Sequence, residues 1–208
     1  MIQEFDVEIT FSLSRIKLHW PEYGEAGANG EDRGFGGNRN YCDLRSMSWS
    51  EARRVYDYER ELVDRIEQAD DPDEEYVRIE DELYDDPCGL YGLDLGTASS
   101  VIALSAARCV PFTSCNAGTF GGKHHEQYPL VAFFARPSHV ALLLECSRVA
   151  DCGLEHGSNG SVVLFARSIQ DLRNFAGNAI SRSSDFGKLR FEQDKNCNKD
   201  PDMQLKLF

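Results

Sequence analysis

The chain has 208 residues, 41% of them hydrophobic and 27% charged, and these values predict one soluble globular domain. Its formal net charge of -13 excludes a surface that binds nucleic acid non-specifically, because such surfaces are basic. No apolar run approaches the roughly 20 residues that span a bilayer, and the first residues lack the basic and apolar blocks of a secretion signal. We therefore expect a cytoplasmic protein that does not bind a membrane.

The cysteines favour a reducing compartment. There are seven of them, an odd number, in a chain that is not small, and none form a CxxC pair. We expect free thiols rather than a disulfide framework, and no zinc ribbon or thioredoxin-type motif.

The N-terminal region, residues 1–20, has a strand pattern. Every second residue from Phe5 to Leu13 is hydrophobic, which is the period of a half-buried strand. Residues 21–47 are rich in glycine, asparagine and charge, and they are typical of a long flexible loop.

Residues 48–86 form an acidic segment with two helical patterns. Ser48 and Glu51 have capping-box spacing, and hydrophobic residues then recur at helical intervals, which predicts a helix over 49–69. A second helix is expected over 74–84.

The charge of the chain is concentrated in this acidic segment. Between Glu51 and Asp86 sixteen Asp and Glu stand against five Arg, a net charge of -11, so the rest of the chain is close to neutral. The segment is either a solvated face or a docking surface for a partner with a basic surface. Its tyrosines favour docking, because tyrosine is enriched at interfaces: Tyr56, Tyr58, Tyr76 and Tyr84.

The region 96–180 is apolar and alternates between helix and strand patterns. This order predicts an α/β (or α+β) single-domain sandwich, in which helices pack on a mixed sheet and the acidic helices are an insertion. A polar tail, 181–208, follows, and residues 203–208 could add an edge strand. The expected elements are a helix over 97–108, a strand over 110–114, a loop over 116–126, a strand over 128–135, a helix over 137–152, a strand over 161–166 and a helix over 168–180.

The stretch from Thr113 to Glu126 is the densest cluster of chemically active residues in the chain. Cys115 at a strand end is a candidate nucleophile, with His125 as its general base and Glu126 to orient the imidazole. The same thiol with His124 or His125, and Glu126, could instead bind a metal ion.

The neighbouring residues are candidates for ligand binding. Glycines let backbone N–H groups approach an anion closely, and short polar side chains hydrogen-bond a ligand. The alternative is a purely structural loop, because buried cysteines and tight glycine turns are common. The candidate ligand-binding residues are Thr113, Ser114, Asn116, Gly118, Gly121, Gly122 and His124.

About fifteen residues around Thr113, Ser114, Cys115 and Gly118 resemble the tRNA wybutosine-synthesis methyltransferase family. That family carries a Thr/Ser-Ser-Cys-x-Gly signature at its functional site. Here the glycine is displaced by one residue, and Thr119 stands where the family has a basic residue. The resemblance implies a related fold more than a shared activity.

Two functions therefore compete. The first is an accessory subunit of a multiprotein assembly, which docks a basic protein surface through the acidic segment. The second is a small enzyme or ligand-sensing domain that works through the loop of Cys115, His125 and Glu126. The sequence identifies no cofactor for either function.

Overall fold

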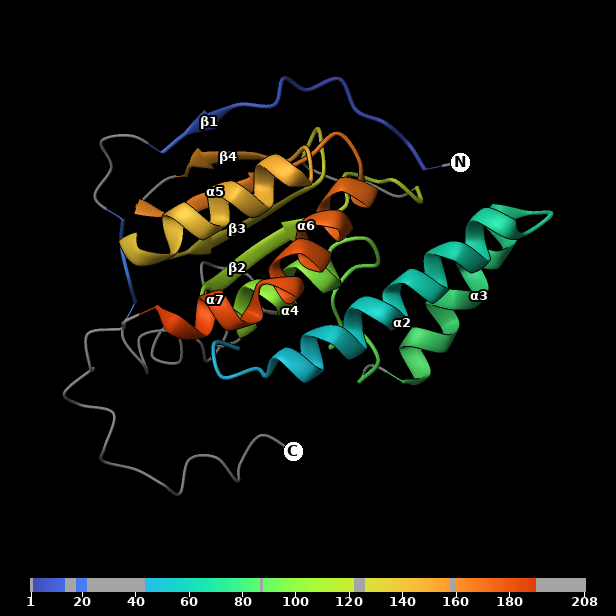
Figure 1. The fold of residues 1–208 in the computed structure, drawn as a ribbon. Helices are drawn as coiled ribbons and strands as arrows, with labels where there is room; N and C mark the ends of the chain where they lie inside the picture. The colour runs from blue at the N-terminus through green and yellow to red at the C-terminus, as the bar shows by residue number, and fades with distance from the viewer. Residues whose placement is uncertain are drawn as a thin grey trace.

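The structure is a computed structural model that describes residues 2–13, 18–21, 44–86, 88–121, 126–157 and 160–189. Its centre is a five-stranded sheet of order β1-β4-β5-β3-β2 (Figure 1). β1 pairs with β4 in parallel and the other neighbours pair antiparallel, so the sheet is mixed. The strands are β1 (Phe11–Ser12), β2 (Val110–Cys115), β3 (Leu130–Phe134), β4 (Gly153–His156) and β5 (Val162–Phe165).

Three helices form a layer on the sheet: α4 (Ala98–Ala106), α5 (Val140–Val149) and α6 (Ile169–Ser181). α4 packs on β2 and α5 packs on β4, while α6 contacts both α4 and α5. Every residue of α4 is buried, which explains why the helix is apolar on all sides. The prediction of a single-domain α/β fold with helices packed on a mixed sheet is confirmed.

The acidic segment is a helical hairpin of α2 (Trp49–Gln68) and α3 (Pro72–Asp85), close to the predicted spans. The Ser48 side chain accepts a hydrogen bond from the Glu51 N–H, as the capping-box spacing predicted. α2 packs against α4 and α6, and α3 packs against α2. The hairpin therefore lies outside the helical layer, and its tip extends away from the sheet (Figure 1).

The N-terminal strand is shorter than predicted, because only Phe11 and Ser12 form β1. The preceding residues contact the sheet through isolated backbone hydrogen bonds. The Phe5 N–H donates to the Arg167 carbonyl at 2.7 Å, and the Thr10 carbonyl accepts from Leu154 at 2.9 Å. The strand predicted from Phe5 to Leu13 is therefore too long, because only two of its residues pair with β4.

The predicted helix over 137–152 is wrong at both ends. It begins as a 3-10 turn, Pro137–His139, and α5 ends at Val149. Asp151 has a φ of 56°, which turns the chain into β4. The first residue of β4 is Gly153. A side chain does not fit at this position, because a Cβ there would lie 2.1 Å from the Phe165 ring.

The region after Ser181 also differs from the prediction of a purely polar tail, because Ser183–Lys188 forms a short helix, α7, that buries Phe186. The possible edge strand over 203–208 lies outside the described residues, as does most of the loop over 21–47.

The cysteines within the described part of the chain are free thiols, as predicted: Cys88, Cys109, Cys115, Cys146 and Cys152. Among the described residues, no helix combines the length and the apolar character that a membrane span needs.

Candidate functional site

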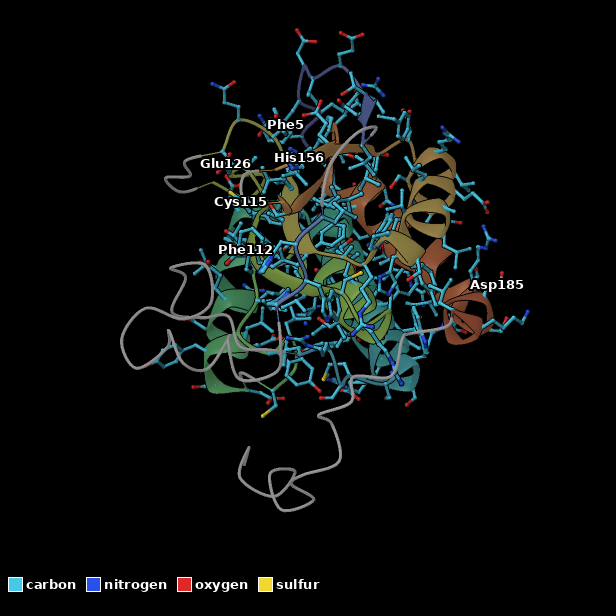
Figure 2. The ribbon with its side chains drawn as sticks, turned by 90° about the vertical axis from the view of Figure 1, so that its left-hand side faces the viewer. Phe5, Phe112, Cys115, Glu126, His156 and Asp185 are labelled. Carbon is cyan, nitrogen blue, oxygen red and sulfur yellow. The ribbon has the colours of Figure 1, made fainter. Side chains whose placement is uncertain are left out.

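The residues that the sequence singled out lie at the end of β2 and in the loop that follows it. Figure 2 labels Cys115 and Glu126 near one another, on the opposite side of the view from Asp185. Glu126 is exposed and Cys115 is partly buried. The other members of the proposed catalytic and ligand set, Gly122, His124 and His125, lie outside the described residues.

The side chains of β2 divide between two faces of the sheet. Thr113 and Cys115 pair with Ala132 and Leu130, whereas Ser114 pairs with Val131, and paired residues share a face. The Ser114 hydroxyl lies 3.1 Å from the Thr97 hydroxyl at the start of α4. Ser114 and Cys115 therefore point to opposite faces and do not serve one ligand together.

The loop 116–121 is held by hydrogen bonds within the protein. Asn116 is buried, and its side-chain N–H donates to the Leu95 carbonyl at 3.0 Å. Its side-chain oxygen accepts from the Gly118 N–H at 3.0 Å, and the Gly121 N–H donates to the Gly118 carbonyl at 2.8 Å. An anion that used the amides of Gly118 and Gly121 would have to displace these bonds.

The same loop rests on the acidic hairpin. The rings of Phe120 and Tyr76 stack with centroids 5.0 Å apart and an interplanar angle of 13°. The Tyr76 hydroxyl donates to Glu80 at 2.6 Å, and burial together with this bond raises the pKa of the phenol. The two candidate regions that the sequence treated as separate are therefore one connected part of the molecule.

A buried carboxylate that the sequence analysis did not select joins this part to the core. Glu59 of α2 is fully buried, and it accepts hydrogen bonds from the backbone N–H groups of Gly96 (2.9 Å), Ala98 (2.9 Å) and Ser99 (3.1 Å). It thus satisfies the N-terminus of α4. Burial raises the pKa of Glu59, although the bonds to Ser99, Gly96 and Ala98 oppose that shift.

The sequence did hold a signal for Glu59. It lies four residues after Val55 and three before Leu62, and both of these are buried in the same stripe of α2. An acid in such a stripe needs donors to compensate its burial.

A second cluster gathers positive charge around Trp20. The guanidinium carbons of Arg136 and Arg45 lie 4.5 Å and 5.0 Å from the centre of the indole ring. His139 stacks on the same ring at 6.1 Å and accepts the Arg136 N–H at 3.0 Å. Burial lowers the pKa of His139 to about 4, so this imidazole is neutral at pH 7.

The surface of the hairpin carries both ion pairs and free carboxylates. Arg65 of α2 binds Glu75 and Glu82 of α3 at 2.7 and 2.8 Å and fastens the two helices together. A hollow of about 520 Å³ lies along α2 beside these ion pairs of Arg65. Its lining residues are Asp57, Tyr58, Arg60, Glu61, Asp64, Arg65 and Gln68.

Among the described residues, no group of three or more His, Cys, Asp and Glu is placed to hold a metal ion. The metal site expected from Cys115 with His124 or His125 depends on residues outside that part of the chain.

Comparison with known proteins gave no relative: no family model, no curated protein and no solved structure matches the chain. The function is therefore inferred from the chemistry of its surfaces.

Proposed function

We propose that this protein is an accessory subunit that docks onto a partner protein through the α2–α3 hairpin. The observation that carries the proposal is which charged side chains of the hairpin are paired and which are not. Four of its five arginines pair with carboxylates inside the hairpin: Arg54 with Glu51, Arg60 with Asp57, Arg65 with Glu75 and Glu82, and Arg78 with Glu74 and Glu75.

The tip of the hairpin keeps its negative charge. Glu67 and Asp70 are exposed and, among the described residues, form no ion pair with any base. Because the tip extends away from the sheet, a second protein can reach it without disturbing the core (Figure 1). Unpaired surface charge of one sign attracts a partner of the opposite sign and orients it on approach.

The loop at Cys115 supports an enzyme less well. Its described amides and side chains bond to the protein itself, and Ser114 and Cys115 face opposite ways. We therefore expect docking to survive Cys115→Ala.

The test is affinity purification of the tagged chain from its native host, with quantitative mass spectrometry of the proteins bound. The double variant Glu67→Lys/Asp70→Lys reverses the tip charge. It should fold, because both residues are exposed and Glu67 lies in the last turn of α2, where a cation favours the helix dipole. We expect this variant to lose a partner that the wild type and Cys115→Ala retain.

The control is Glu4→Lys/Glu8→Lys, which changes the net charge equally at exposed positions of the N-terminal segment. It should keep the partner. An identical set of bound proteins for the wild type, the tip variant and variants elsewhere on the surface of the hairpin would overturn the proposal.

A further inference from the structure

The outward side of α3 presents two hydrophobic side chains to solvent. Val77 is 55% exposed and Tyr84 is 87% exposed, whereas Ile79 on the opposite side of the helix is fully buried. Val77 and Tyr84 are seven residues apart, so they lie on one side of the helix, about 10 Å from each other along its axis. Neither contributes to the core.

Exposed carboxylates flank this pair on α3. Asp73, Asp81 and Asp85 are exposed and, within the part of the chain that the structure describes, form no ion pair. The one basic residue of α3, Arg78, is bound to Glu74 at 2.6 Å and lies 3.4 Å from Glu75. We call Asp73, Val77, Asp81, Tyr84 and Asp85 the α3 stripe.

We propose that the α3 stripe is the recognition surface for a basic amphipathic helix of the partner protein. This inference rests on the proposed docking function and names the partner's chemistry. The seven-residue spacing of Val77 and Tyr84 matches the repeat with which two helices pack side by side. Lys and Arg beside the partner's apolar residues would meet Asp73, Asp81 and Asp85.

The charge of the stripe excludes two other classes of partner. Anionic lipid surfaces and nucleic acids are negative, and the stripe carries three carboxylates, while the one base of α3, Arg78, is paired with Glu74. A basic helix is the partner for which both the apolar pair and the carboxylates are favourable, and tyrosine is enriched in such contacts.

The first experiment measures binding of two synthetic helical peptides to the full chain by fluorescence anisotropy. Both peptides have about 20 residues, enough for a stable helix, with Leu along one face. One carries Lys at all flanking positions and the other carries Glu. We expect the Lys peptide to bind, the Glu peptide not to bind, and the affinity of the Lys peptide to fall as salt is raised.

Two variants separate recognition from general attraction by a negative protein. Val77→Ser/Tyr84→Ser leaves the charge unchanged and should weaken the Lys peptide about tenfold, or about 1.4 kcal/mol. Asp81→Lys/Asp85→Lys should weaken it by at least as much, whereas Glu4→Lys/Glu8→Lys should change it less than about threefold. Circular dichroism of each variant checks that the helices are retained.

Equal binding by the wild type and Val77→Ser/Tyr84→Ser would overturn the inference, because attraction would then depend on charge alone. The host purification separates this failure from failure of the proposed function. If the tip variant loses the partner while Val77→Ser/Tyr84→Ser keeps it, the hairpin docks the partner but the α3 stripe is not its site. If both variants keep every bound protein, the docking function itself is wrong.

Discussion

At the scale of single residues, Glu59 stabilises the start of α4. Its carboxylate replaces the water that would otherwise satisfy three backbone N–H groups at the start of α4. Gly96 contributes one of these groups, and its φ of 95° with the Ile169 side chain 2.7 Å from a built Cβ leaves no room for another residue. The turn from Gly96 to Ala98 therefore needs both the acid and the glycine.

Replacing Glu59 should destabilise the fold without affecting the surface of the hairpin. Glu59→Ala leaves three buried donors without an acceptor, and we expect the free energy of unfolding to fall by about 3 kcal/mol or more. Chemical denaturation measures the loss. A loss below about 1 kcal/mol would mean that the three N–H groups find other acceptors.

The pH dependence of Glu59 has a definite sign. Because burial raises the pKa of Glu59 in the folded state above its ordinary value of 4.5, the folded protein binds more protons than the unfolded chain just above that pH. Glu59 therefore stabilises the fold most below pH 4.5, and this contribution is lost as the pH rises through the folded pKa. Glu59→Gln lacks this change, so the free energy of unfolding of the wild type should fall relative to that of the variant as the pH rises through that window.

At the scale of elements, the contact between α3 and the loop 116–121 connects the two regions that the sequence singled out. The Tyr76–Phe120 stack is that contact, and aromatic pairs of this kind contribute about 0.5–1.5 kcal/mol beyond the area that they bury. The loop also has residues with positive φ, Ala117 at 56° and Gly118 at 74°, so its shape depends on the contacts that hold it.

Tyr76→Ala should therefore loosen the loop. We expect hydrogen exchange of the Gly118 and Gly121 amides to become about tenfold faster, while exchange in β3 changes little. Hydrogen–deuterium exchange with mass spectrometry reads both regions in one experiment.

The chain offers a matched control for this variant. Tyr84→Ala removes the same side chain from the same helix at a position that is 87% exposed, and it should leave the loop unchanged. Equal exchange rates in the loop for Tyr76→Ala and Tyr84→Ala would show that the stack does not hold it.

The sequence predicted α2 and the strands β2, β3 and β5 close to their observed positions, but it did not predict β4. α2 has twenty residues with a cap and a regular apolar stripe, so several signals agreed on it. β4 has four residues directly after a helix, and its start depends on Asp151 and on the fit of Gly153 against Phe165. That fit is a tertiary contact, which no local pattern contains.

The sequence predicted the local structure of the candidate site, but not the contacts that this site makes with the rest of the molecule. The stretch from Thr113 to Gly121 does form a strand end and a turn, as expected. The pairing of Tyr76 with Phe120 joins residues 44 positions apart in the chain, and Glu59 meets α4 across a similar distance. Such contacts follow from the packing of whole elements, so local sequence patterns could not show that the two regions are in contact.

At the scale of the whole molecule, the negative charge is concentrated in the helical hairpin rather than spread over the α/β core. The hairpin segment between Glu51 and Asp86 has a net charge of -11 out of -13 for the chain, and most of its ion pairs lie inside it; Asp64 pairs instead with Arg173 of α6. Like charges at close range repel, so the folded hairpin is held by the contacts of Ile79, Arg65 and Tyr76 against this repulsion. A basic partner of the kind proposed would offset this repulsion.

This repulsion should make stability depend on salt. Raising the salt concentration from about 10 mM to about 200 mM shortens the Debye length from about 30 Å to below about 10 Å and screens the hairpin. We expect the melting temperature of the wild type to rise by about 2–4 °C, since roughly 1 kcal/mol shifts a chain of this size by that amount. Differential scanning fluorimetry at both concentrations measures the rise.

The charge variants identify where the repulsion acts. Glu67→Lys/Asp70→Lys places cations among the carboxylates of the hairpin tip, so it should melt higher than the wild type at low salt and respond less to added salt. Glu4→Lys/Glu8→Lys changes the net charge equally, away from the hairpin, and should keep most of the wild-type response. If the two variants respond alike, the repulsion arises from the net charge of the molecule rather than from the hairpin. The carboxylates of the tip would then be as well solvated as other carboxylates on the surface.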